Sequence, residues 1–236
     1  MGVNIKTQGV HTEVNPMNLF EKPYRYRYLL VFIKLAVVLY IFLSSEDVRA
    51  LMYYVFRVKV SGKTICQWAK KFPVELPKDK IKYKEDEDVL LFADEKFVWI
   101  KGIKAYWWSV RDHLGNVLAN IVTMRRDTAS AKELLRRAKE RINGRVNAVV
   151  HDGLKAYNGA VNWVFGRKCK NIIAGIQGKF VMINKKAYLI TNNLSESINA
   201  QVDCYLARHH YNFNSLESAN HFATMFLYRK NLRDAC

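Results

Sequence analysis

The chain has 236 residues, of which 50% are hydrophobic and 13% aromatic, so it can bury at least one substantial core and is not a disordered tail. Lysine and arginine number 38 against 21 acidic residues, and the formal charge of +17 indicates a polyanionic partner, with nucleic acid favoured over an anionic membrane. The 4 cysteines lie far apart without a C-x-x-C spacing, which signals neither a zinc site nor a disulfide framework and fits a cytoplasmic protein.

The first part of the chain contains one long apolar run. Residues 1–23 show no periodicity and are expected to form an N-terminal arm. The run "YLLVFIKLAVVLYIFL" (28–43) follows basic residues and resembles a signal anchor. It is shorter than the roughly 20 residues that span a membrane, and it contains Lys34. A buried helix is therefore favoured over a membrane anchor.

Residues 24–73 are expected to form a small all-α helix-turn-helix domain. "SSED" (44–47) has the form of a capping box before a helix of about three turns. Ser61 can cap a second helix, over 62–72, that Pro73 stops. The polar side of this second helix carries Lys63, Gln67, Lys70 and Lys71. The pattern fits a recognition helix for the DNA major groove and, equally, an ordinary helical hairpin with a solvated basic face.

A change of pattern follows. Residues 74–88 are charged and contain proline, which predicts a linker, and residues 89–236 are expected to form a catalytic domain. Three strand-like segments (89–102, 104–112 and 117–124), a helix (127–142) that Asp127 can cap, a buried strand (146–150) and a helix from Gly153 predict an α/β fold with a mixed sheet. A C-terminal amphipathic helix is expected over 215–233.

Three carboxylates stand out in this domain. Asp94 lies in the first strand segment, and Asp152 in "VVHDGLKAY" follows the carboxyl end of a buried strand, where ligands of open α/β sheets bind. Glu196 lies on a helix face away from the apolar stripe. Each residue alone has an ordinary explanation, as an edge charge, a turn residue or a capping partner. Together, three oxygen ligands suit a pair of Mg²⁺ or Mn²⁺ ions.

The order of motifs adds a family resemblance. "ADEKFVWIKG", "WWSVRDHLGNVLANIVTMRRDTASAKELLRRA", "VVHDGLKAY" and "NNLSESIN" together resemble the catalytic domain of DDE transposases from small insertion sequences, in particular those with a helix-turn-helix before an RNase H-like integrase domain. The resemblance covers residues 44–229. It implies an RNase H-like mixed sheet flanked by helices, and a metal-binding catalytic triad of Asp94, Asp152 and Glu196 that cleaves and joins DNA strands at transposon ends.

The chain departs from this pattern in two places. The interval between Asp152 and Glu196 is longer than usual in this fold, so an extra strand or loop is expected near residues 168–186. Many relatives carry a basic residue two helical turns after the glutamate, whereas this chain has Asp203 there, and Arg208 is a nearby cation. Arg125 and Arg126 lie at a strand end, where phosphate contacts and a solvated turn are equally compatible with the sequence.

The sequence therefore predicts a DNA transposase that binds double-stranded DNA at terminal inverted repeats and in the target. Self-association is expected, because two transposon ends must be brought together. The alternative is a catalytically inactive DNA-binding protein derived from a transposable element. A membrane-anchored basic protein is a third and less favoured hypothesis.

Overall fold

The computed structural model describes residues 27–72, 80–84, 87–174, 178–190, 193–209 and 212–234, without the side chains of 193–195 and 231–234. The chain divides into two compact units, one formed by residues 1–40 and 45–74 and the other by residues 75–236 with 41–44. The predicted N-terminal arm over 1–23 lies outside the described residues. No helix in the described ranges is long and apolar enough to cross a membrane.

The first unit is helical. Its helices are α1 (Leu30–Phe42), α2 (Ser45–Phe56) and α3 (Gly62–Lys71). The apolar run forms α1, with Ile33, Ala36 and Val37 buried, as expected for a packed helix. Ser61 caps α3 as predicted, because its hydroxyl accepts a hydrogen bond from the Thr64 amide at 3.1 Å.

The apolar side chains of α2 are only partly buried. Val48 and Met52 are buried, whereas Leu51 and Val55 are exposed. On α3 the side chains of Ile65, Trp68 and Ala69 form the packed face. The polar face of α3, with Lys63, Gln67 and Lys70, is exposed.

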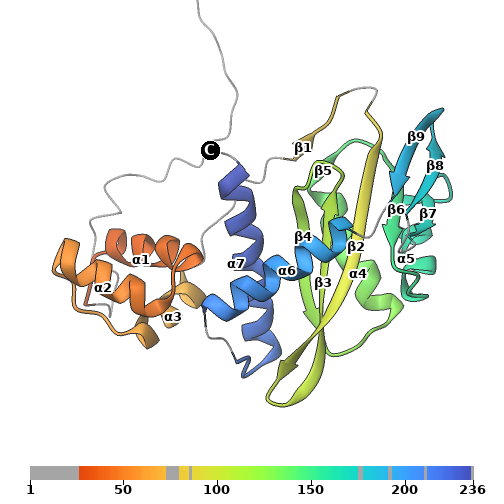
Figure 1. The fold of residues 1–236 in the computed structure, drawn as a ribbon. Coiled ribbons are helices and arrows are strands. Elements are labelled where there is room, and N and C mark those ends of the chain that lie inside the picture. The colour runs from red at the N-terminus through yellow and green to blue at the C-terminus, as the bar shows by residue number, and fades with distance from the viewer. Residues whose placement is uncertain are drawn as a thin grey trace, which may run out of the picture. The chain divides into compact units, whose positions relative to one another are not determined.

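The second unit confirms the predicted α/β fold with a mixed sheet flanked by helices (Figure 1). The central sheet has the strand order β4-β3-β2-β6-β7, in which β2, β3 and β4 are antiparallel and β2, β6 and β7 are parallel. These strands are β2 (Val89–Ile100), β3 (Ile103–Asp112), β4 (Val117–Thr123), β6 (Val146–His151) and β7 (Lys170–Ile173). The turn between β3 and β4 falls at "HLGN", between the strand-like segments expected over 104–112 and 117–124.

Helices cover both faces of this sheet. One face packs against α4 (Thr128–Glu140), which Asp127 caps as predicted, and α5 (Ala156–Phe165). The other face is covered by α6 (Asn193–Arg208), which crosses β2, and by α7 (Leu216–Asp234) (Figure 1). Trp107 and Trp108 point to opposite faces and both are fully buried. Each is therefore part of a core, one contacting α7 through Phe226 and the other contacting Tyr157.

Two small pairings complete the unit. Residues 81–82, within the segment expected as a linker, form β1 (Ile81–Lys82), which pairs in parallel with β5 (Ile142–Asn143). The long interval before Glu196 holds the antiparallel hairpin of β8 (Lys179–Ile183) and β9 (Lys186–Ile190). Ile183 and Ile190 of this hairpin pack on the sheet beside β6 and β7. The extra residues thus cover apolar sheet surface.

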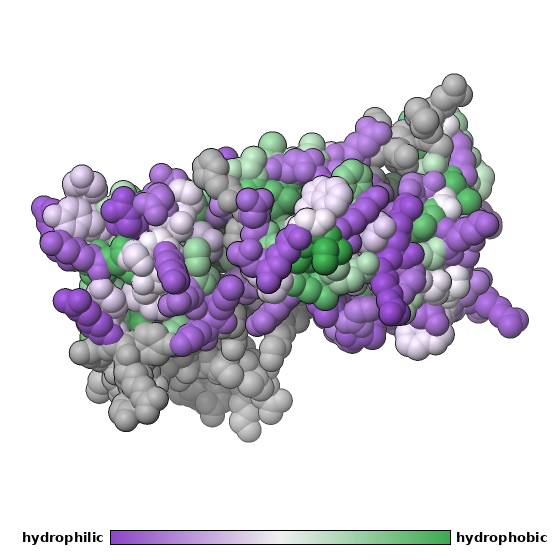
Figure 2. All heavy atoms as spheres, turned by 90° about the horizontal axis from the view of Figure 1, so that it is seen from below, coloured by the Kyte–Doolittle hydropathy of each residue, from purple (hydrophilic) through white to green (hydrophobic). Residues whose placement is uncertain are grey.

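The β2–β3 hairpin extends beyond the region that β4 pairs with. The last pair between β3 and β4 is Tyr106 with Thr123, whereas β2 and β3 continue to the pair Ile100 and Ile103. An apolar patch with hydrophilic side chains around it lies over the end of this hairpin in the view from below (Figure 2). Phe97, Trp99 and Ile103 at this hairpin end are exposed.

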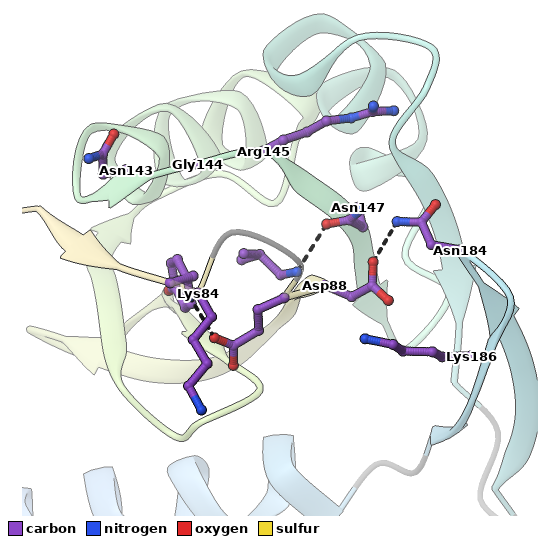
Figure 3. Close-up of a pocket in the computed structure, with 11 residues that line it drawn as sticks. Lys84, Asp88, Asn143, Gly144, Arg145, Asn147, Asn184 and Lys186 are labelled. Atoms are coloured by element: carbon purple, nitrogen blue, oxygen red, sulfur yellow. Dashed lines mark hydrogen bonds between the residues drawn. The ribbon is translucent and has the colours of Figure 1, made fainter.

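A pocket of about 590 Å³ lies where the amino ends of β2 and β6 approach the β8–β9 turn (Figure 3). Asp88, which is 5% exposed, accepts hydrogen bonds there from the Asn184 amide and from the Tyr188 hydroxyl at 2.8 Å. The Val89 amide donates to Asn147 at 3.0 Å. The two bonds to Asp88 attach the β8–β9 hairpin to the sheet, whereas the bond to Asn147 joins β2 to β6.

Replacing Asp88 by alanine should destabilise the protein by about 1–3 kcal/mol, because the Tyr188 hydroxyl and the Asn184 amide lose their acceptor. Urea unfolding followed by circular dichroism would measure the change. The exposed Glu140, changed to alanine, is the control and should leave stability close to that of the parent protein. Equal stability of the two variants would contradict the anchoring role.

Candidate metal centre

The register between β2 and β6 places two aspartates side by side. The parallel strands pair Leu91 with Val149 and Phe92 with Val150. Two residues further along each strand are Asp94 and Asp152, the second of which follows the last residue of β6. Since parallel strands in register keep equivalent residues adjacent, the two carboxylates meet at the carboxyl end of β6.

Glu95 joins these two aspartates. Asp94, Glu95 and Asp152 each offer one carboxylate oxygen, and these oxygens lie within 4.8 Å of one another. Oxygens on opposite sides of one Mg²⁺ ion are about 4.1 Å apart, given bonds of about 2.0–2.1 Å. A set of three carboxylates at this spacing therefore fits a hard divalent cation with only small side-chain movements.

The electrostatics of the cluster also suit a cation. Burial, together with the neighbouring Asp152 carboxylate, raises the pKa of Asp94. Burial raises the pKa of Glu95 to about 7, although the hydrogen bond from Arg126 acts in the opposite direction. Both shifts mean that negative charge in this cluster is unfavourable without a positive partner. A bound cation would relieve that repulsion.

Arg126 supplies positive charge to the cluster in this structure. Its Nε donates to the Glu95 carboxylate at 2.8 Å, and its guanidinium lies 3.8 Å from the Asp152 carboxylate. The Glu95 carboxylate also accepts a hydrogen bond from the buried Tyr157 hydroxyl at 3.2 Å. Glu95 is thus held from two sides, while Asp152 is more open to solvent.

Helix α6 is attached to β2 at the same place. The Asn199 amide donates to the Asp94 carboxylate at 2.8 Å, and Lys96, two residues along β2, forms an ion pair with Asp203. Residues four apart on a helix rise by about 6 Å, close to the rise of about 6.6 Å between residues two apart on a strand. The two contacts therefore fix α6 along β2 in one register.

Glu196 lies in the first turn of α6 and is exposed. It precedes Asn199 by three residues, so it projects from the same side of the helix, one turn toward the amino end. Among the described residues, the cluster of three carboxylates contains Glu95 and does not contain Glu196. The structure thus brings together Asp94 and Asp152 of the predicted triad, with Glu196 about one helical turn beyond the contact to Asp94.

The residues predicted to contact DNA occupy several places. On α3 the side chains of Lys63, Gln67, Lys70 and Lys71 are all exposed. Arg125 and Arg208 are exposed as well, at the end of β4 and the end of α6. Arg126 differs, because Glu95 and Asp152 engage its guanidinium.

His151, which precedes Asp152, is held inside the protein by hydrogen bonds. It is buried, its Nε2 lies 2.7 Å from the Asn171 side-chain oxygen, and its Nδ1 accepts from the Gly153 amide at 3.0 Å. Burial lowers the pKa of His151, which favours the neutral ring. Gly153 has a φ of +103°, so glycine suits the turn that carries Asp152 past the strand end.

Sequence reasoning did not identify Glu95 and Asn199 as site residues. Strand alternation places Glu95 on the sheet face opposite to Asp94, so the strand pattern alone predicts that the two carboxylates lie apart. Because β6 ends at His151, β2 has no β6 partner at residues 94 and 95, and both side chains reach Asp152 around this open edge. Locally, the sequence indicates a link between the two carboxylates only by placing Glu95 directly after Asp94.

Comparisons with known proteins establish the family. The chain is similar to a chain in the cryo-EM structure of the simian T-cell lymphotropic virus intasome in complex with the PP2A regulatory subunit B56 gamma, with 13% identity, a TM-score of 0.41 and coverage of 81% of this chain and 67% of that chain. No curated protein matches the chain. Residues 89–232, more than half of the chain, match the model of the DDE domain named DDE_Tnp_IS240. The chain therefore belongs to the DDE domain family of transposases.

Proposed function

We propose that the protein binds the ends of its transposable element and cleaves and joins DNA strands by metal-assisted phosphoryl transfer. The observation that carries the proposal is the meeting of Asp94 and Asp152 at one edge of the sheet, supplied by two parallel strands. Two aspartates at this spacing bind hard cations, and a phosphodiester is a substrate whose leaving and attacking oxygens such cations stabilise.

The residues of the site have separate roles in this proposal. Asp94 and Asp152 hold Mg²⁺ or Mn²⁺, and Glu196 approaches from α6 as the third ligand. Its place on the same helix side as Asn199, which contacts Asp94, supports this role. Bound ions, two in number, would activate the attacking hydroxyl or water and stabilise the leaving oxygen.

Glu95 and Arg126 position the cluster. The Glu95 carboxylate holds the partly exposed Arg126 guanidinium beside Asp152. From there Arg126 can pair with a phosphate oxygen of the substrate, one of the two roles compatible with the sequence, once cations neutralise the carboxylates. The same side chain would thus serve the acidic cluster and the DNA in turn.

DNA is held by the cationic surface. The formal charge of +17 favours binding to phosphates, and α3 presents three lysines and a glutamine on its exposed face. We assign α3 to recognition of the terminal inverted repeats, and Arg125 and Arg208 to phosphate contacts near the cleavage site. A homo-oligomer would bring two ends together for joining to target DNA.

Cleavage of DNA that carries the element's own flanking ends tests the proposed reaction. Asp152→Asn should lower the cleavage rate with Mg²⁺ more than about 100-fold, because loss even of groups that orient a metal ligand costs about 10–100-fold. Glu140→Gln, an exposed carboxylate on α4, is the matched control and should cleave normally. DNA binding without cleavage by the parent protein under either metal would instead support an inactive, DNA-binding derivative of a transposase.

Metal binding has a readout that does not depend on activity. Adding Mn²⁺ should raise the thermal unfolding temperature of the parent protein, because a ligand that binds only the folded state stabilises it. Asp152→Asn should lose this increase, and without metal it should be no less stable, since it removes charge repulsion with Asp94. An unchanged increase in the variant would contradict the metal site.

The role of α3 is tested by the salt dependence of DNA binding. The double variant Lys63→Ala and Lys70→Ala should weaken binding and reduce the slope of log K against log salt by about two, one for each phosphate that the protein no longer neutralises. Lys34→Ala, an exposed lysine of α1, is the control and should keep the parent slope. Identical slopes for both variants would remove α3 from the DNA interface.

A further inference from the structure

The end of the β2–β3 hairpin exposes two large aromatic side chains. Phe97 is 58% exposed and Trp99 is 57% exposed. Val98, which lies between them, and Ile100, which follows Trp99, are buried. Strand alternation normally gives an exposed face to polar residues, so aromatic residues at both outward positions depart from that pattern. Glu95 precedes them on the same side of β2.

A cation accompanies these rings. Trp99 pairs across the hairpin with Lys104, and Phe97 pairs with Tyr106. The Lys104 ammonium lies 4.7 Å from the centroid of the Phe97 ring and 5.8 Å from that of Tyr106. Stacking faces beside a positive charge are complementary to nucleic-acid bases and their phosphates. We call Phe97, Trp99 and Lys104 the hairpin platform.

The backbone that carries this platform is held from its other side. The Lys101 amide donates to the Phe213 carbonyl at 3.0 Å, and Ile100 forms a β-bridge with Phe213. The buried Trp107 packs against Phe213 and Phe226. The rings are therefore presented on fixed strands, which lowers the entropy lost when a ligand binds.

The platform lies on the same strand as the acidic cluster. At about 3.3 Å per residue, Phe97 is about 7 Å and Trp99 about 13 Å along β2 from Glu95. This is the length of about two to four stacked nucleotides, which are spaced by about 3.4 Å in one strand. A DNA strand with a phosphate at the carboxylates could place its next few bases over the two rings.

We propose that the hairpin platform binds unpaired bases beside the phosphate that is cleaved. The ligand is a short single-stranded segment of DNA, because base faces are available for stacking on Phe97 and Trp99 only where the duplex is open. Lys104 would contact the phosphate of the same segment. This inference rests on the proposed function and adds a preference for opened DNA ends.

The test compares two fluorescein-labelled DNAs with the full chain in EDTA, so that no cleavage occurs. One duplex is blunt and the other has a short 3′ overhang. The parent protein should prefer the overhang, and Trp99→Ala should reduce that preference about tenfold, the value expected for loss of one stacked base. Trp99→Phe, which keeps an aromatic face, should retain most of it.

Trp163 provides the matched control. It is 64% exposed, and the Lys132 ammonium lies 5.1 Å from its ring centroid, so it has the same chemistry on α5, away from the hairpin end. Trp163→Ala should leave the preference for the overhang unchanged. If Trp163→Ala also lost the preference for the overhang, the effect would be common to exposed aromatic residues, and the proposal would be overturned.

Two other outcomes would also overturn it. Trp99→Ala could weaken binding to both DNAs equally, or it could leave DNA binding intact and instead dissociate oligomers in analytical ultracentrifugation. The second result would assign the platform to a contact between copies of the chain. Neither result would affect the cleavage test with Asp152→Asn, and failure of cleavage would not alter the binding measured in EDTA.

Discussion

Repulsion among the carboxylates of Asp94, Glu95 and Asp152 is the main electrostatic constraint on the second unit. The parallel register of β2 and β6 places Asp94 beside Asp152, and Glu95 reaches them around the open edge of β2. Bringing buried acidic groups together is costly without positive charge, as the raised pKa values of Asp94 and Glu95 indicate. Such an arrangement is understandable at a site that holds cations, and membership of the DDE domain family fits this.

The surrounding elements support this cluster from several directions. Asn199 attaches α6 to Asp94, and the ion pair of Lys96 with Asp203 fixes the next turn of that helix. Asp203 on α6 thus pairs with a cation supplied by β2. Farther away, Asp88 attaches the β8–β9 hairpin over the other half of the same sheet face.

Much of the fold could be predicted because local patterns determine it. Caps at Ser61 and Asp127, the turn at "HLGN" and the buried run 146–150 all depend on neighbouring residues. The site was harder to predict from the sequence. Glu95 joins Asp94 only where β6 ends, and the contacts of Asn199 and Arg126 link distant segments. The exposed residues of α2 and the strand β1 within the expected linker likewise depend on tertiary packing.

The central claim is that Asp94 and Asp152 together bind divalent cations. Anomalous scattering from crystals grown with Mn²⁺ measures this most directly, because the metal is located independently of activity. The account predicts Mn²⁺ peaks between the carboxylates of Asp94 and Asp152, with Glu196 drawn toward them and Arg126 displaced. Saturating Mn²⁺ with no peak between the two aspartates would contradict it.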